Sequence, residues 1–159
     1  LKQIKQIENL VNEFSDFARM PKPLFKPNNL NNVINTNACG PIMLTDALLD
    51  NLQVSAHPIV AVITSRIASI KDNTSGGSYA YRASKSALNA IMHSFAIDVQ
   101  DMGIKVLLLH PGWVKTNITH YHGLIEAPKS VKGMLDIIHH HQDYPSGSFI
   151  HYEGYVLPW

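Results

Sequence analysis

A tyrosine and a lysine, Tyr81 and Lys85, are the residues whose types and spacing best suit proton transfer in this chain. Four residues apart on a helix, the two side chains lie on one face. A free phenol titrates at about pH 10, too high for exchange at neutral pH, but a neighbouring ammonium group favours the phenolate and lowers the pKa. We therefore expect Tyr81 to act as a general acid or base.

Ser65 adds a hydroxyl group at the end of an apolar run upstream of this pair. A hydroxyl beside the phenol can hold a substrate carbonyl oxygen while negative charge develops there. A Tyr-x-x-x-Lys match by itself is more often a half-buried surface pair than a site. Here the pair follows a strand that ends at Ser65, and the next strand ends in Pro111-Gly112. The combination predicts a site that reduces carbonyl groups.

Short apolar runs predict the strands that would position these groups. Residues 59–63 are rich in β-branched side chains, and residues 104–109 form a second run, as is typical of strands buried on both faces of a parallel sheet. Residues 148–152 predict a last short strand.

Between these runs, apolar side chains recur at helical spacing. We expect helices from a cap at Asn28 or Asn29 through Leu48, from Ala80 to Val99 with Gly103 ending it, and from Pro128 to Ile138. Alternating strands and helices indicate an α/β fold with a doubly wound, Rossmann-like parallel sheet. Ligands bind such sheets at the carboxyl ends of the strands, where Ser65 and Pro111 fall.

The composition fits one globular domain with a buried core, since 45% of the 159 residues are hydrophobic and 16% are charged. A net charge of +1 gives no electrostatic reason to expect a nucleic acid or a membrane surface as partner. No apolar stretch approaches the length of a membrane span. The single cysteine, Cys39, excludes an internal disulfide and suits a reducing compartment, so we expect a cytoplasmic protein.

Several separated segments resemble the short-chain dehydrogenase/reductase family, in its carbonyl reductase branch of the C-factor and sniffer type. The matching segments, in the family's order, are residues 36–44, 63–70, 72–77, 79–89, 109–116, 147–150, 152–154 and 158–159. The resemblance covers the chain from about residue 28 to its end. It implies an enzyme that transfers hydride between a nicotinamide cofactor and a carbonyl compound or alcohol.

The resemblance also implies a role for each matching residue. Tyr81 would donate the proton, Lys85 would lower the Tyr81 pKa and bind the nicotinamide ribose, and Ser65, rather than Thr64, would orient the substrate carbonyl. Asn37 would hold a water molecule in the proton relay. The segment lining the nicotinamide and its phosphates would comprise Pro111, Gly112, Val114 and Thr116. The implied cofactor is NADP, with NAD as the alternative; the substrate is a small carbonyl compound, and homo-oligomer formation is left open.

Pro41 gives physical support for the role of Asn37. Proline cannot donate the helical hydrogen bond to the carbonyl group four residues earlier, which is that of Asn37. We expect the helix to kink there and to leave this carbonyl free for a water molecule. The alternative is a buried asparagine that is merely tolerated in a kink.

The family's glycine-rich turn, which cradles the cofactor pyrophosphate, has no counterpart among the nine glycines. Residues 1–27 are interpreted as a degenerate fourth-strand region and loop, in which Ile7–Asn12 resembles the strand but Glu13-Phe14-Ser15 replaces Asn-Ala-Gly. Residues 28–159 are interpreted as the catalytic part of a single, partial domain. We expect a fragment of a longer protein rather than a shortened paralogue. The rival function is a truncated, non-catalytic interaction module.

Other reactive side chains receive simpler interpretations. His139-His140-His141 are adjacent at a helix end, where histidines interact favourably with the helix dipole, so no metal site is expected. Cys39 is expected to pack rather than react. In the loop that follows Pro111-Gly112, contact with the substrate is open for His120 and His122, and contact or packing for Trp113.

Overall fold

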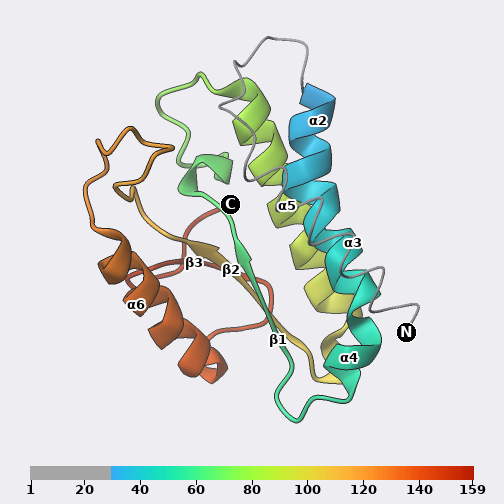
Figure 1. Cartoon of the computed structure of the whole chain (residues 1–159). Coiled ribbons are helices and arrows are strands. Elements are labelled where there is room, and N and C mark those ends of the chain that lie inside the picture. Colours follow the sequence, from blue (N-terminus) through green and yellow to red (C-terminus); the bar gives the residue numbers. More distant parts are fainter. Residues whose placement is uncertain (1–29) are drawn as a thin grey trace.

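A parallel three-stranded sheet forms the centre of the molecule, which a computed structural model describes over residues 30–159. The strands lie in the order β1 (Ile59–Ile63), β2 (Lys105–His110) and β3 (Ser148–His151), with Ile63 beside Leu109 and His110 beside His151. Figure 1 shows α2, α3 and α5 on one side of the sheet and α6 on the other. The expected doubly wound parallel fold is confirmed.

The helical elements follow the predicted order. They are α2 (Leu30–Ile34), a π-helical turn (Asn35–Cys39), α3 (Gly40–Ala47), α4 (Leu49–Gln53), α5 (Tyr79–Asp98) and α6 (Ala127–His139), with short 3-10 turns at Arg66–Ala68, Gln100–Met102 and His141–Asp143. Helix α4 extends the helical region beyond Leu48, where the predicted helix ends. The predictions for Ile7–Asn12 and Glu13-Phe14-Ser15 lie outside the described residues.

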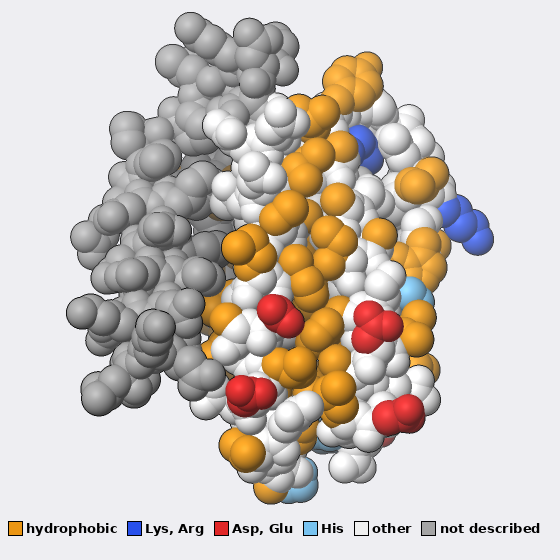
Figure 2. Space-filling model, turned by 90° about the vertical axis from the view of Figure 1, so that its right-hand side faces the viewer, with side chains coloured by type: hydrophobic (Ala, Val, Ile, Leu, Met, Phe, Trp, Pro, Cys, Tyr) orange, Lys and Arg blue, Asp and Glu red, His pale blue; other side chains and the backbone are white. Residues whose placement is uncertain are grey.

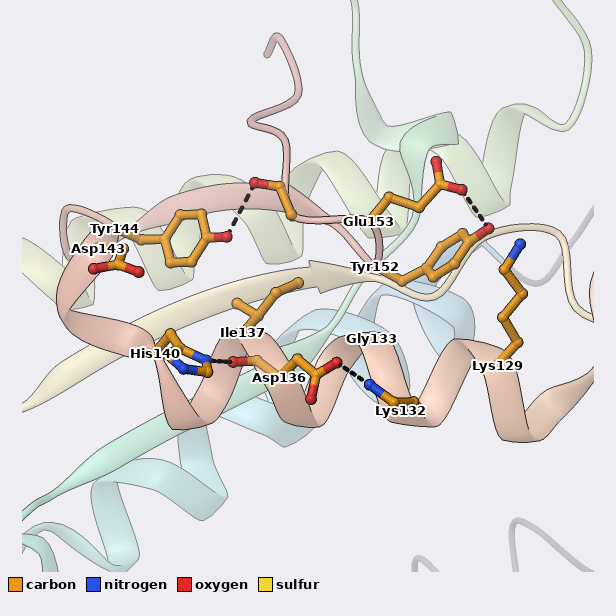
Figure 3. A pocket seen from close by; sticks show the side chains of 11 residues that line it. Lys129, Lys132, Gly133, Asp136, Ile137, His140, Asp143, Tyr144, Tyr152 and Glu153 are labelled. Atoms are coloured by element: carbon orange, nitrogen blue, oxygen red, sulfur yellow. Dashed lines mark hydrogen bonds and ion pairs between the residues drawn. The ribbon is translucent and has the colours of Figure 1, made fainter.

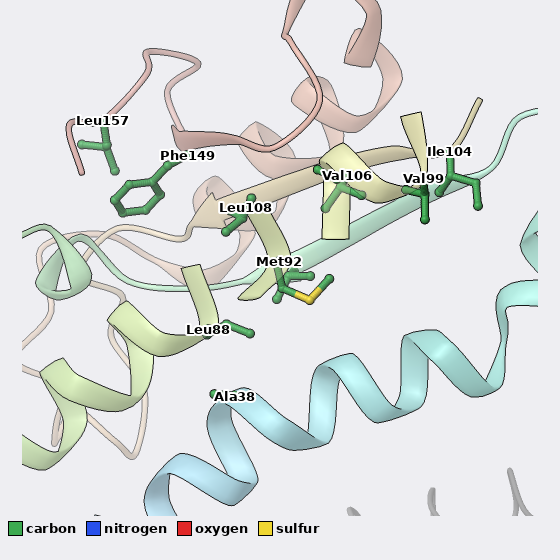
Figure 4. Close-up of a cluster of buried hydrophobic side chains, with 11 residues drawn as sticks. Ala38, Leu88, Met92, Val99, Ile104, Val106, Leu108, Phe149 and Leu157 are labelled. Atoms are coloured by element: carbon green, nitrogen blue, oxygen red, sulfur yellow. The ribbon is translucent and has the colours of Figure 1, made fainter. Parts of the chain in front are cut away.

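Strand β2 is apolar throughout because both of its faces are covered. Val106 and Leu108 point into a core cluster beside α5, whereas Leu107 and Leu109 pack against α6 on the opposite face. All four side chains are fully buried. Figure 4 shows the cluster on the α5 side, where Met92 faces the strands. This packing explains the unbroken apolar run in the sequence.

The buried side chains of helix α5 fix the position of its first turn, which carries residues of the candidate site. Leu88, Met92 and Ala96 follow helical spacing and pack against the sheet, and Ala38 packs on the same cluster from the π-helical turn. The first turn of α5 is thereby placed at the carboxyl end of β1. Gly103 ends the 3-10 turn after α5. Its φ of 69° lies in the left-handed region, which glycine adopts without a steric cost.

The outer face of the α2–α3–α5 layer carries a band of hydrophobic side chains with acidic side chains beside it (Figure 2). Exposed apolar residues of these helices include Met43 on α3 and Ile97 on α5. Within the described part of the chain, no helix combines the length and the apolar character that crossing a membrane requires.

Candidate active site

Ser65 lies just beyond β1 and begins the 3-10 turn Arg66–Ala68. Its backbone is extended, and its Oγ accepts a hydrogen bond of 3.3 Å from the backbone N–H of Ile67. A serine in this capping position uses an oxygen lone pair for the turn and keeps its O–H for another acceptor. The fold therefore presents the Ser65 hydroxyl as a donor at the carboxyl end of the sheet.

Tyr81 comes from the first turn of α5 and meets Ser65. Its side chain is 37% exposed, so the phenol is partly covered and still open to the surface. Burial raises the pKa of Tyr81 above its ordinary value, and a hydrogen-bonding interaction with the Ser65 side chain acts in the opposite direction. The structure thus brings these two predicted residues together and leaves the phenol protonated at neutral pH.

Lys85 lies one turn further along α5, on the side facing the same strand end. Its Nζ donates a hydrogen bond of 3.0 Å to the carbonyl oxygen of Ile63, the last residue of β1, and burial lowers the pKa of Lys85. The expected lowering of the Tyr81 pKa by this ammonium group is wrong for the protein alone. Burial raises the Tyr81 pKa by more than the Ser65 side chain lowers it, so the net change is upward.

Asn37 lies in the π-helical turn that replaces a regular α-helical turn just before Pro41. The turn is closed by a hydrogen bond from the N–H of Gly40 to the carbonyl oxygen of Asn35, five residues earlier. An inserted residue of this kind accommodates a proline, whose ring and missing N–H disrupt an α-helix. The helix therefore departs from α geometry where Pro41 predicts it should.

The side chain of Asn37 joins this turn to α5 through a serine that the sequence did not single out. Its Nδ2 donates a hydrogen bond of 3.0 Å to Oγ of Ser84, which is fully buried. The Ser84 hydroxyl in turn donates 2.9 Å to the carbonyl oxygen of Tyr81. Ser84 directly precedes Lys85, but a serine within a helix carries no sequence signal of such a role.

The segment after β2 carries the residues expected to face the cofactor. Its conformation is fixed by a 2.6 Å hydrogen bond from Ser130 Oγ to the carbonyl oxygen of Pro111 and by a bridge between Val114 and Ile125. The backbone N–H of Thr116 donates 3.0 Å to Thr119 Oγ1. The segment therefore leaves the sheet as a turn that is hydrogen-bonded to α6 and bridged to the loop before α6.

Gly112 is required in this segment for steric reasons. Its φ is 82°, and a Cβ atom there would lie 2.7 Å from Cε1 of Tyr152 and 2.8 Å from Cδ1 of Ile125. These residues fit the nicotinamide half of a dinucleotide: a glycine turn without side chain, together with the hydrogen-bonding groups of Tyr81 and Lys85. For the pyrophosphate half, the sequence offers no glycine-rich turn.

Two histidines at the ends of neighbouring strands were also not singled out by sequence reasoning. The rings of His110 and His151 have centroids 5.2 Å apart, and Nδ1 of His110 is buried without a partner among the described residues. Burial, with His151 and Arg66 nearby, lowers the pKa of His110 to about 4. His110 is therefore neutral at pH 7.

The remaining reactive residues differ in exposure. His120, His122 and Trp113 are exposed in the loop after Gly112, and Cys39 is half-buried in the π-helical turn. Within residues 30–159, no three side chains of metal-binding type gather as ligands would.

A cavity of about 510 Å³ lies between α6 and the turn after β3, and Figure 3 shows its lining. Lys132 pairs with Asp136 along α6, while the Tyr144 hydroxyl donates to the carbonyl oxygen of Gly154 across the opening. None of the residues predicted for catalysis or cofactor binding lines this cavity. It is a surface hollow separate from Ser65 and Tyr81.

Comparison with known proteins gives consistent matches. The family described as short chain dehydrogenase matches residues 1–124. C-signal of Myxococcus xanthus is 44% identical over 123 residues, which cover 77% of this chain and 74% of C-signal. The 1-hydroxy-2-glutathionyl-2-methyl-3-butene dehydrogenase of Rhodococcus sp. is 38% identical over 79% of this chain and 57% of its own length.

Solved structures give the same result. Carbonyl reductase Sniffer of D. melanogaster superposes with a TM-score of 0.77 at 30% identity, covering 98% of this chain and 74% of that one. An NADPH-bound carbonyl reductase from chicken fatty liver gives 0.73 at 30% identity, over 88% of this chain and 61% of that one. The chain therefore spans 57% to 74% of the length of each of these four proteins.

Proposed function

This chain belongs to the short-chain dehydrogenase family, as its match over residues 1–124 shows, and we propose that it is an NADP(H)-dependent oxidoreductase that reduces small carbonyl compounds. The reverse reaction would oxidise the corresponding alcohol. The observation that carries this proposal is that Tyr81 and Lys85 lie one turn apart on α5 at the end of β1, where Ser65 begins the next turn and Lys85 Nζ donates 3.0 Å to the carbonyl oxygen of Ile63. A nicotinamide cofactor, when bound, supplies the hydride.

Holding that cofactor is assigned to two parts of the site. Lys85 and Tyr81 would hydrogen-bond the nicotinamide ribose, and the turn after β2 would line the nicotinamide and phosphates, through Pro111, Gly112, Val114 and Thr116. Among the described residues, the Lys85 ammonium group uses one of its three N–H donors on the Ile63 carbonyl oxygen, which leaves donors for a ribose. The NADPH in the chicken carbonyl reductase structure favours NADP over NAD.

The roles of Ser65 and Tyr81 in reduction follow from their hydrogen bonds and charge states. Ser65 would donate its O–H to the substrate carbonyl oxygen, because the N–H of Ile67 already occupies one of its lone pairs. As negative charge develops on that oxygen, Tyr81 would transfer its phenolic proton to it. A pKa raised by burial supports this direction, since it keeps the acid form of the phenol populated.

Asn37 would supply the route by which Tyr81 recovers its proton. The π-helical turn around Asn37 supports this assignment, because a turn closed five residues apart alters which helical carbonyl groups are free to bind water. The side chain of Asn37 is already committed to Ser84, so the backbone carbonyl is the group proposed to hold the water.

A second function, a non-catalytic interaction module, is favoured by one observation, the missing glycine-rich turn. Under both proposals the protein acts in the cytoplasm, and a second copy of the chain is a proposed partner.

Titration of NADPH into the purified 159-residue chain, followed by calorimetry, separates the two functions. Saturable binding that weakens in a Lys85→Met variant supports the oxidoreductase. No binding at millimolar NADPH supports the interaction module.

A further inference from the structure

We propose that Arg82 is a positioning residue that holds the Ser65 hydroxyl against the Tyr81 phenol by clamping the loop between them. The inference rests on the proposed function and deepens it. Arg82 neighbours Tyr81 in the sequence, yet its guanidinium group turns away from α5 and binds the loop that leads from Ser65 to that helix.

The guanidinium group uses all three of its nitrogens on this loop. Nε donates to the carbonyl oxygens of Gly77 at 3.0 Å and Gly76 at 3.3 Å, and Nη2 donates to Gly76 at 3.1 Å and to Ser75 Oγ at 2.9 Å. Nη1 reaches back to the carbonyl oxygen of Ile67 at 3.1 Å. One side chain therefore ties both ends of the loop to the start of α5.

The backbone at one end of the loop needs such support. Gly76, Gly77 and Ser78 have φ values of 63°, 67° and 49° in succession. For a serine, the left-handed conformation costs free energy and persists only where surrounding contacts impose it. Two of the three carbonyl groups that Arg82 binds, those of Gly76 and Gly77, belong to this left-handed run, so the clamp fixes the direction in which α5 begins.

At the other end of the loop, the clamp reaches Ser65 through a single residue. The N–H of Ile67 donates to Ser65 Oγ at 3.3 Å, while the carbonyl oxygen of Ile67 accepts from Arg82. The backbone N–H of Ile67 is thus bonded to Ser65, and its carbonyl oxygen is bonded to Arg82. Arg82 thereby fixes the short turn that orients the Ser65 hydroxyl, and it does so from the residue next to Tyr81.

This geometry predicts an effect on Tyr81 that simple loop stabilisation does not. The Ser65 side chain lowers the Tyr81 pKa, against the effect of burial. If Arg82 sets the position of Ser65, loosening the clamp should raise the Tyr81 pKa as far as removing the Ser65 hydroxyl does. Arg82→Lys is the informative variant because it keeps the positive charge but cannot bind several acceptors as a planar fork.

The experiment places a fluorotyrosine at position 81 and follows its titration by fluorine NMR in four proteins. These are the wild type, Arg82→Lys, Ser65→Ala and the double variant. We expect Arg82→Lys and Ser65→Ala to raise the pKa of residue 81 similarly, and the double variant to match Ser65→Ala alone. An unchanged pKa in Arg82→Lys, or additive shifts in the double variant, overturns the proposal.

The matched control is Arg66→Lys, the same replacement on the same loop. Arg66 makes a single ion pair, 2.8 Å to Asp72, and is expected to leave the pKa of residue 81 unchanged. If Arg82→Lys does not fold by circular dichroism, Arg82→Gln is compared with Arg66→Gln, so that each variant loses one positive charge from the loop, and an equal shift of the residue 81 pKa in the two variants overturns the proposal.

Activity gives the second readout. For carbonyl reduction, kcat/KM of Arg82→Lys should fall on the order of tenfold or more, while KM for NADPH should change much less, because the segment after β2 is untouched and Lys85 keeps its hydrogen bond to the end of β1. If the wild type neither binds NADPH nor reduces carbonyls but the pKa pattern holds, the proposed function fails and the clamp stands. If turnover is present and the pKa pattern is absent, the clamp fails and the proposed function stands.

Discussion

The side-chain amide of Asn37 donates a hydrogen bond of 3.0 Å to the buried hydroxyl of Ser84, which itself donates to the backbone of Tyr81. The π-helical turn and α5 are thus joined at the two residues proposed for proton relay and proton donation. A polar link between buried helices is costly to leave half made, because a buried group without a partner keeps its full desolvation penalty.

Replacing either partner should therefore destabilise the protein. We expect Ser84→Ala and Asn37→Ala each to lower the free energy of unfolding by about 1–3 kcal/mol, as measured by urea denaturation. The double variant should lose much less than the two single losses combined, because each variant removes the same bond. Simple additivity would contradict the link.

Gly112 provides a prediction about the cofactor segment. Gly112→Ala should destabilise the protein more than Gly103→Ala, because both glycines have positive φ but only the Cβ at position 112 meets other atoms below 3 Å. The conformational cost alone is about 1–2 kcal/mol, and Gly103→Ala should show no more than that in thermal denaturation. Equal losses in the two variants would show that the contacts with Tyr152 and Ile125 yield without cost.

The pH dependence of stability should carry the signature of His110. Its pKa is about 4 in the folded protein against 6.5 ordinarily, so the unfolded chain binds the proton more readily. Its neutral form contributes stability fully above pH 6.5, and that contribution is lost as the pH falls from 6.5 towards 4. The loss should be on the order of 3 kcal/mol at most, from the size of the pKa shift.

The variant His110→Phe removes this titration and keeps a ring beside His151. Its melting temperature should fall less than that of the wild type between pH 7 and about pH 5. In this range His110 takes up a proton in the unfolded wild-type chain and stays largely neutral in the folded protein. His139→Phe, at the exposed end of α6, should keep the wild-type slope. Parallel pH profiles for His110→Phe and the wild type would exclude His110 as the source.

Much of the fold could be predicted from the sequence because its signals are local. The β-branched run at 59–63 gave the strand Ile59–Ile63 with its bounds, and the apolar spacing of α5 gave a helix correct to within about a residue. Pro41 predicted the irregular turn at Asn37 because its missing N–H is a property of the residue itself. Local chemistry was sufficient for these features.

What escaped prediction depends on contacts between distant residues. Ser84, Arg82 and His110 have ordinary sequence surroundings, and their hydrogen bonds or burial come from packing that spacing does not encode. The direction of the Tyr81 pKa was also wrong, because i and i+4 spacing places Lys85 near the phenol without showing that its Nζ binds the Ile63 carbonyl oxygen. The lysine's partner is set by where β1 ends relative to α5.

The most direct test of the central claim is carbonyl reduction by the wild type and by Tyr81→Phe, measured as loss of NADPH absorbance over a panel of aldehydes and ketones. Tyr79→Phe is the matched control, since Tyr79 is 84% exposed and lies two residues before Tyr81, off the helix face that Tyr81 and Lys85 share. We predict that the wild type and Tyr79→Phe consume NADPH equally, whereas Tyr81→Phe folds normally and is slower by about a hundredfold or more. Reduction by Tyr81→Phe at the wild-type rate, or none by the wild type at saturating NADPH, would contradict the account.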